Sequence, residues 1–578
     1  MKKFFDIIVL CVIVIFIFPS CSKNQDFDLE IETDKQKWWD EAKFGMFIHF
    51  GVYSVPAGRF VGTDLDGVTY TSNESSTANG VGAEWLMFTS RIPRETYKLY
   101  ANSFTCSNFN ADEIAMLAKS AGMKYLVITI KHHDGFVMYP TKFTEWNIAN
   151  SAAKGKDIIN EIQNACVRNG LKFGVYFSQN IDWMAEGSYG EVPEINGYYD
   201  DHSKYDLYTE NLINEFVNRY PNIDLIWWDG YHANSNEVVA NLFKNAALSV
   251  RPNIIFNDRL YSKHEGDYIT PEMNLNLPIQ KFQRFELCNS INKKSWGYSE
   301  SGHQQYYMSA KEIIVNLLRC IQYGGNMLLN VGPKADGSIP HSQTAPLREA
   351  GEIIHKMGGV YKSNSLKQLY GQHNCICRYT EENGQTILYV TKMPGVDVTE
   401  INVTGINNSI SSVKTNHTVT KVGNTITIKG LKGDFDTARI QLVGEIDCYD
   451  AGINLPCVGV ISPLSAYANG ELGVGLGDED QFMYTNWRGN YSGSIEYMFN
   501  VIEEKSYKIS VYTAEMSNYE ITIEIDGVKY PKNISLGYQR HKSTIIDAIS
   551  LSKGSHVIKL TISSDEEKWA NFYGIEFE

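Results

Sequence analysis

Between residues 34 and 360, short apolar runs alternate with stretches whose apolar positions recur every three to four residues. The runs predict strands and the stretches predict helices. Several runs are apolar at nearly every position, which is typical of strands buried on both faces of a parallel sheet. Seven strands are predicted in this way, at residues 43–50, 124–131, 172–178, 224–229, 253–258, 285–291 and 326–331.

Three of the predicted helices carry clear boundary signals. Asn110 is a favourable N-cap ahead of one apolar stripe, and Gly170 ends another stripe at residues 158–166. Ser309 and Glu312 have the spacing of a capping box, in which each side chain bonds the backbone amide of the other residue.

Repeated strand–helix units over residues 34–360 predict an irregular (β/α)8 barrel of the TIM type. Seven strands are recognisable, and residues 253–291 lack a helical pattern, so the irregularity is expected there. After residue 360 the apolar positions recur every two residues, as in antiparallel strands. We therefore predict an α/β barrel followed by two all-β sandwich domains, at residues 361–445 and 446–578.

The N-terminus combines Lys2-Lys3, an apolar run at residues 7–18, and Ser20-Cys21. This order resembles a bacterial lipoprotein signal, with residues 1–21 as the signal, Cys21 as the lipidated residue and residues 22–33 as a tether. It predicts an exported protein, lipid-anchored in the bacterial cell envelope and facing the periplasm or the cell surface. A plain secretory signal and an uncleaved anchor are the alternatives.

Composition narrows the class of protein. The formal charge of −15 argues against a nucleic-acid partner, because phosphates require a basic face. The ten cysteines are scattered and form no CxxC pair, which argues against a zinc site or a disulfide framework. With 43% hydrophobic and 12% aromatic residues, the chain can bury a large core and line a concave site with rings.

Polar residues gather at the C-terminal ends of the predicted strands. In a barrel these ends converge on one mouth, where TIM barrels place their active sites. The arrangement predicts a pocket for a small ligand with many hydroxyl groups, because each hydroxyl needs a paired donor and acceptor. In chain order the residues are His49, His132, His133, Tyr176, Asp229 and Arg259.

Simpler interpretations exist for the same residues. Each histidine alone could be a hydrogen-bonded core residue, and Asp229 could cap the turn that follows its strand. A metal site is another alternative, although neighbouring residues on a strand point to opposite faces and rarely bind one ion. Its ligands would be His49, His132, His133 and Asp229.

Eight motifs in order make the chain similar to glycoside hydrolase family 29, the α-L-fucosidases. They extend over residues 34–360, and such an ordered set is far more specific than any one motif. The motifs are Trp38-Trp39-Asp40 with residues 43–51, Glu84-Trp85, residues 131–136, Trp227-Trp228-Asp229-Gly230, Asn257-Asp258-Arg259, residues 266–272, residues 295–298 and residues 330–333.

The resemblance implies a retaining exo-α-L-fucosidase in which Asp229 is the nucleophile and a second carboxyl is the acid/base. Glu272 and Glu286 are both candidates for the second role. Glu272 is the first choice, because a loop leaving the active-site face can reach the mouth. Glu286 opens a predicted strand and could be an interior structural carboxyl.

The resemblance also implies the substrate contacts. Fucose would be held by His49, Glu84, Trp85, His132, His133, Tyr176 and Arg259, with Trp296 against its C5-methyl group. The expected substrates are fucosylated oligosaccharides or glycoprotein glycans, and no cofactor is required. An inactive sugar-binding lipoprotein and a metal-dependent hydrolase are the alternative functions, and the linkage preference and oligomeric state stay open.

Residues 446–578 resemble the jelly-roll carbohydrate-binding modules attached to many glycosidases. Tyr507, Ile509 and Val511 alternate with polar residues, and Asp526-Gly527 is a typical hairpin turn. A purely structural β-sandwich is the alternative. No clear ligand motif supports calcium in this block.

Overall fold

The structure is a computed structural model. It describes residues 34–71, 76–77, 82–263, 266–273, 284–300, 307–369, 371–457, 459–469, 473–476, 482–488, 493–515, 519–534, 539–563 and 569–578. The predicted signal, Cys21 and the tether lie outside this part of the chain. Within it, none of the helices has the length and apolar character needed to cross a bilayer.

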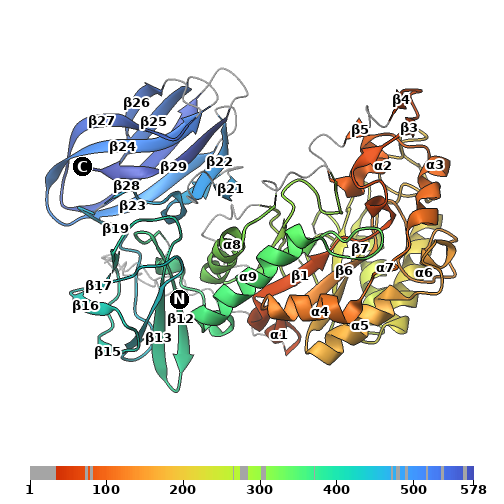
Figure 1. The fold of residues 1–578 in the computed structure, drawn as a ribbon, viewed down its shortest axis with the longest axis horizontal. Helices are drawn as coiled ribbons and strands as arrows, with labels where there is room; N and C mark the ends of the chain where they lie inside the picture. The colour runs from red at the N-terminus through yellow and green to blue at the C-terminus, as the bar shows by residue number, and fades with distance from the viewer. Residues whose placement is uncertain are drawn as a thin grey trace, which may run out of the picture.

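All seven predicted strands of the first domain form, and they make one parallel sheet (Figure 1). The sheet order is β10-β11-β1-β6-β7-β8-β9, so the chain winds around as in a TIM-like barrel. The strands are β1 (Phe44–Ile48), β6 (Tyr125–Lys131), β7 (Lys172–Ser178), β8 (Ile223–Asp229), β9 (Ile255–Phe256), β10 (Glu286–Ser290) and β11 (Asn326–Val331).

The eighth position of the barrel is taken by residues 267–273, between β9 and β10. The Asp267 amide donates to the carbonyl of Phe256 (2.8 Å), and the Cys288 amide donates to that of Pro271 (3.0 Å). Glu272 itself forms a parallel bridge with Cys288. The irregularity falls where it was predicted. Glu272 was predicted on a loop, and the segment that carries it belongs to no regular strand but forms isolated bridges to both neighbours of the barrel.

Helices surround the sheet, and the predicted boundary signals are confirmed. The Asn110 side chain accepts from the Glu113 amide, Gly170 caps α5 with φ 72°, and Ser309 and Glu312 form the capping box of α8. The helices are α1 (Asp34–Ala42), α2 (Leu86–Thr89), α3 (Arg94–Lys98), α4 (Ala111–Ser120), α5 (Ile158–Asn169), α6 (Ser203–Arg219), α7 (Glu237–Leu248), α8 (Ala310–Tyr323) and α9 (His341–Met357).

Two antiparallel sheets follow the barrel, next to α8 and α9 (Figure 1). Their order is β12-β13-β18-β15 and β14-β17-β16, with a shared apolar core. The strands are β12 (Cys375–Glu382), β13 (Gln385–Lys392), β14 (Glu400–Val403), β15 (Ile410–Val413), β16 (Thr418–Val422), β17 (Thr425–Lys429) and β18 (Thr437–Leu442).

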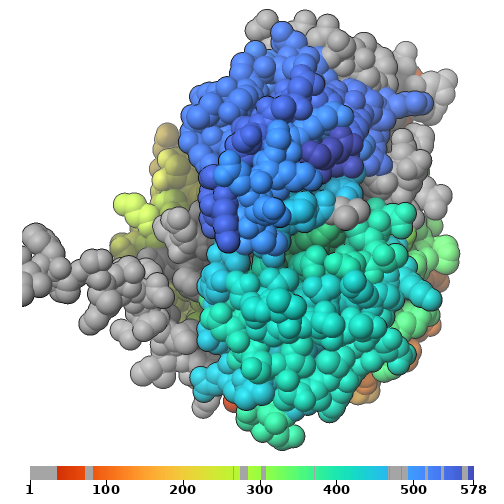
Figure 2. Space-filling view, turned by 90° about the vertical axis from the view of Figure 1, so that its left-hand side faces the viewer, coloured from red at the N-terminus to blue at the C-terminus, as the bar shows by residue number. Residues whose placement is uncertain are grey.

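The C-terminal block forms a second β-sandwich, which sits on the small β domain (Figure 2). Asn374 joins the two, because it donates to the carbonyl of Val460 (3.2 Å) and accepts from the amide of Ser462 (2.8 Å). Sugar binding by this sandwich stays a prediction. Its strands are β19 (Ile453–Leu455), β20 (Tyr467–Asn469), β21 (Gly473–Leu476), β22 (Phe482–Arg488), β23 (Ser494–Val501), β24 (Lys505–Glu515), β25 (Tyr519–Ile525), β26 (Val528–Ile534), β27 (His541–Leu551), β28 (Gly554–Ser563) and β29 (Trp569–Phe577).

Asn257 extends the pairing of β8 beyond the point where the short strand β9 ends. Its side-chain amide donates to the carbonyl of Trp228, and its side-chain oxygen accepts from the Trp228 amide, both at 2.9 Å. The side chain is fully buried. A side chain thus replaces backbone pairing directly before Asp229, the last residue of β8.

Asn257→Ala should destabilise the barrel by about 2–4 kcal/mol, because it leaves two buried backbone groups of Trp228 without partners. Chemical denaturation followed by tryptophan fluorescence measures the change. The exposed Asn218 of α6 gives the matched control, since its replacement by alanine should cost less than about 0.5 kcal/mol. Equal stability of Asn257→Ala and the wild type would contradict the assignment.

Candidate active site

A pocket of about 220 Å³ opens at the carboxyl ends of the barrel strands. This is smaller than the pockets of about 300–1,000 Å³ that hold drug-sized ligands, so it suits a single small ring. Every described residue that the sequence placed at the site lines it, with the exception of Glu286. The lining is Phe47, His49, Glu84, Trp85, His132, His133, Tyr176, Ile181, Trp227, Asp229, Gly230, Tyr231, Arg259, Glu272 and Trp296.

Asp229 ends β8 and points into the pocket. The Tyr176 hydroxyl donates to Asp229 Oδ2 (2.8 Å), and Arg259 Nη1 lies 3.2 Å from Oδ1. Burial opposes ionisation, but Arg259, His133 and the Tyr176 hydroxyl together outweigh it and place the pKa of Asp229 below its ordinary value. The carboxylate is therefore ionised and equipped to act as a nucleophile.

Arg259 joins Asp229 to a second carboxyl. Its Nη2 donates to Glu272 Oε2 (2.9 Å), while Nη1 pairs with Asp229. The guanidinium also lies over the Trp227 indole, with 4.7 Å from its carbon to the ring centroid. Asp229 and Glu272 thus face one pocket from opposite sides of a single cation. The Glu272 side chain is 41% exposed, which leaves it in contact with water.

Glu286 lies inside the barrel, beneath the pocket. Its side chain is fully buried and accepts hydrogen bonds from Trp227 Nε1 (3.0 Å) and from the Tyr125 hydroxyl. Burial raises the pKa of Glu286 to about 7. The carboxyl supports Trp227, one of the pocket walls, and does not itself line the pocket. This is the interior structural position that the sequence offered as an alternative for Glu286.

His49 is oriented by Asn330 at the end of β11. The Asn330 side-chain oxygen accepts from the His49 amide (3.0 Å) and from His49 Nδ1 (2.8 Å), while its amide group donates to the Trp296 carbonyl (2.7 Å). With its proton on Nδ1, the ring keeps Nε2 as an acceptor. Burial lowers the pKa of His49 to about 4, so the ring is neutral at pH 7.

His133 is oriented in the same way by Ser178, the last residue of β7. The Ser178 hydroxyl donates to the carbonyl of Ile181 (2.8 Å) and so accepts from His133 Nδ1 (2.7 Å). His133 Nε2 lies 3.8 Å from Asp229 Oδ2. Burial lowers the pKa of His133 to about 4 and that of His132 still further. Both rings can therefore exchange hydrogen bonds with sugar hydroxyls without carrying charge.

Glu84 and Trp85 come from the 3-10 turn Ala83–Trp85, outside the barrel strands. Glu84 Oε2 accepts from the Gly297 amide (2.8 Å), which connects this turn to the segment that carries Trp296. Burial raises the pKa of Glu84. The Trp85 ring stands edge-on to His133, with 5.0 Å between centroids. These two segments form the side wall of the pocket.

Gln179 is a positioning residue that the sequence did not single out. Its side-chain oxygen accepts from the Asp229 amide (3.0 Å), and its amide group donates to the carbonyls of Arg259 (2.8 Å) and Leu260 (3.0 Å). One fully buried side chain therefore sets the spacing of two strand ends. Gln179 directly follows the predicted strand that ends at Ser178, and this position was the sequence signal that could have identified it as a site residue. Phe47, Ile181 and Tyr231 also line the pocket without having been predicted to do so, whereas Trp227 lies where a tryptophan before Asp229 was expected to wall it.

The metal alternative gains no support from the geometry. Among the residues that the structure describes, including those of the C-terminal sandwich, no group of three His, Cys, Asp or Glu side chains could hold an ion. The ring nitrogens of His49 and His133 that face Asn330 and Ser178 are already used as donors.

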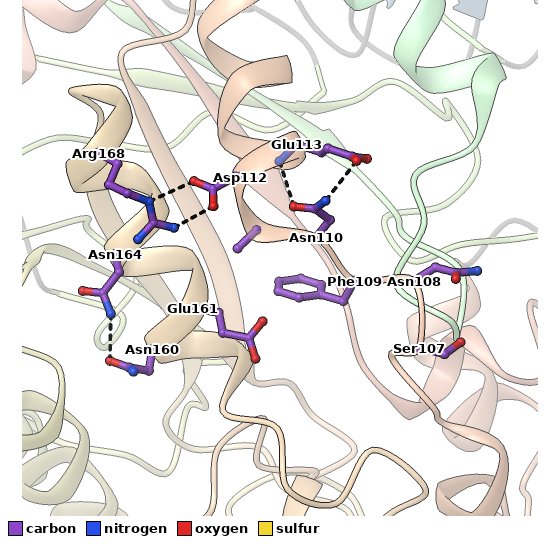
Figure 3. Close-up of a pocket in the computed structure, with 11 residues that line it drawn as sticks. Ser107, Asn108, Phe109, Asn110, Asp112, Glu113, Asn160, Glu161, Asn164 and Arg168 are labelled. Carbon is purple, nitrogen blue, oxygen red and sulfur yellow. Dashed lines mark hydrogen bonds and ion pairs between the residues drawn. The ribbon is translucent and has the colours of Figure 1, made fainter.

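A second hollow, of about 710 Å³, lies outside the barrel between the N-terminal end of α4 and one side of α5 (Figure 3). Asp112 and Arg168 form a two-point ion pair across it (3.0 and 2.8 Å), and Asn110 bonds Glu113. These side chains are exposed and bond one another. Although this hollow is larger, it lacks the buried, converging polar groups of the pocket at the strand ends, which is the better candidate.

Known proteins share this architecture. A sequence model of α-L-fucosidase matches residues 20–359. A putative α-L-fucosidase of Caenorhabditis elegans is 30% identical over 354 residues, which cover 58% of this chain and 68% of that protein. The α-L-fucosidase from Vibrio sp. strain EJY3 has a TM-score of 0.71 at 20% identity and covers 93% of this chain and 98% of its own. That last likeness shows a shared fold that includes both β domains.

The Thermotoga maritima α-fucosidase, solved in complex with fucose, is 26% identical, with a TM-score of 0.55. The match covers 70% of this chain and 96% of that chain. It joins the family model and the nematode relative in pointing to α-L-fucosidases built on the same fold. This chain belongs to the α-L-fucosidase family of glycoside hydrolases.

Proposed function

We propose that the protein is a retaining exo-α-L-fucosidase that removes terminal fucose from glycans or glycoconjugates through a covalent fucosyl-enzyme. The observation that carries the proposal is the Arg259 guanidinium, which holds Asp229 and Glu272 at one small pocket. Retaining glycosidases use such a neighbouring pair of carboxyls. The fucose complex of the Thermotoga maritima relative supports fucose as the sugar that this pocket binds.

In the first step, an Asp229 oxygen forms a bond to the anomeric carbon as the glycosidic bond breaks. Glu272 gives its proton to the leaving oxygen, so the glycan departs as a neutral alcohol. In the second step, Glu272 takes a proton from water, the water oxygen bonds to the anomeric carbon, and Asp229 leaves. Two inversions give α-fucose, and Glu272 ends protonated as it began.

The other lining residues fit the roles of ligands for the sugar. Neutral His49, His132 and His133 can each pair with ring hydroxyls, and Glu84 adds an acceptor. The rings of Trp85 and Trp296 supply apolar surface for the C5-methyl group. Family membership implies that no cofactor takes part.

Asp229→Ala should lower kcat for an aryl α-L-fucoside by at least about 10⁴-fold, because the first step loses its nucleophile. The fold should persist, since Asp229 lies at the pocket and not in the core. Proton NMR of the wild-type reaction should show α-fucose as the first anomer. Early β-fucose would refute retention, and near wild-type activity of the variant would refute the nucleophile.

The two glutamates can be separated by the leaving group. Glu272→Ala should slow the hydrolysis of fucosylated oligosaccharides at least about 100-fold more than that of dinitrophenyl fucoside, which departs without protonation. Glu286→Ala is the matched control and should lower both rates by similar factors, because it removes support from Trp227. Steady-state kinetics on both substrates decide, and the opposite pattern would assign the acid to Glu286.

The cell location is a separate proposal, which rests on the sequence alone. We infer that Cys21 is lipidated and anchors the enzyme in the cell envelope, where two or more acyl chains give stable attachment. Cys21→Ala should release the protein from membranes or block its processing, as fractionation would show. Mass spectrometry of the mature N-terminus is the direct check, and an unmodified terminus beyond Cys21 would support simple secretion.

A further inference from the structure

Aromatic side chains continue outward from the rim of the fucose pocket. Tyr231 lines the pocket, yet half of the residue (50%) is exposed to solvent. Tyr198, on the long loop after β7, is 54% exposed. Large exposed rings next to a binding pocket mark a surface for a further part of the ligand more often than they mark packing.

His232 connects these two tyrosines. It follows Tyr231 in the chain, and its ring lies against that of Tyr198, with 5.5 Å between centroids and 41° between planes. His232 Nδ1 accepts from the Asn234 amide (3.3 Å), which places the ring proton on Nε2 in the neutral form. Tyr231, His232 and Tyr198 are called here the rim platform: Tyr231 lines the pocket, His232 follows it in the chain, and Tyr198 packs on His232.

The loop that carries Tyr198 is held in place by the barrel. Val192 and Gly197 pair across the loop, and the Glu194 side chain accepts from the Arg94 amide (2.8 Å). Arg94 Nε also donates to the carbonyl of Trp183, whose ring packs against Trp85 of the pocket wall (2.8 Å for the hydrogen bond, 5.4 Å between ring centroids). The position of Tyr198 is therefore set before a ligand arrives, and binding does not have to order the loop.

We propose that the rim platform of Tyr198, Tyr231 and His232 binds the leaving group, and that it selects a pyranose ring with an apolar face. This assignment rests on the proposed function, because the leaving glycan must exit past Glu272 through the same mouth. Tyr231 follows the Asp229-Gly230 turn and is the platform residue that also lines the pocket. The sugar attached to fucose can stack on Tyr231 while His232 Nε2 donates to one of its hydroxyl groups.

Two substrates isolate this contact. The leaving group of fucosyl-α-1,2-galactose is a pyranose, whereas that of α-L-fucosyl fluoride is a fluoride ion. The ratio of their kcat/KM values therefore reports binding of the pyranose at the leaving-group site. Tyr231→Ala should lower this ratio about tenfold, the factor that corresponds to about 1.4 kcal/mol of lost stacking. Tyr231→Phe should keep the ratio within about twofold of the wild type, because the ring face is retained.

Tyr198→Ala should lower the same ratio by about threefold, because it removes the ring that packs on His232. This second variant lies outside the pocket and keeps the test valid if Tyr231→Ala does not fold. Tyr449→Ala, at an exposed tyrosine just beyond the small β domain, is the control and should change neither rate. An unchanged ratio in both Tyr231→Ala and Tyr198→Ala would overturn the rim platform. A wild-type enzyme that releases fucose from neither substrate would instead refute the proposed function.

Discussion

The rest of the pocket depends on the two ion pairs that Arg259 makes, one with Asp229 and one with Glu272. Arg259 lowers the pKa of Asp229 and so opposes the effect of burial, which raises the pKa of this carboxyl. It also brings a carboxyl from the irregular eighth segment to the end of β8. Without Arg259, the two carboxyls at the mouth would lack a compensating charge. The shape of the barrel mouth and its chemistry are therefore maintained by the same cation.

Around this charged centre the histidine rings that line the pocket are polar but uncharged. The histidines are held uncharged by burial, and each of His49 and His133 has one ring nitrogen committed to a buried side chain, Asn330 or Ser178. Beneath them, Glu286 accepts from Tyr125 and Trp227. Neutral donors and acceptors in fixed directions suit sugar hydroxyls, because they bind without competing with Asp229 for the charge of Arg259.

The limits of prediction are clear at the eighth barrel position. The seven recognised strands all have apolar runs, and all seven form. Residues 267–273 include Pro271 and two acidic residues, so they lack the apolar run that predicts a strand. Their pairing partners lie in and next to the neighbouring strands β9 and β10. For the same reason Glu272 was expected on a loop. Its arrival at the pocket follows from a segment whose conformation is set by contacts distant in sequence.

The barrel, the two β domains and the pocket residues at the strand ends could be predicted from the chain, because strand ends are visible as apolar runs that stop at polar residues. Glu84, Trp85 and Trp296 could be predicted only from the resemblance to the fucosidases. The sequence ranked Glu272 ahead of Glu286 for the acid/base role but left both open. Only the tertiary structure separated them, by placing one beside Arg259 at the mouth and the other in the interior under Trp227. It alone revealed Gln179 as the spacer of two strands and Tyr198 beside His232. Contacts between distant segments depend on how the strands wind around the barrel, and no local sequence pattern encodes which segments come together.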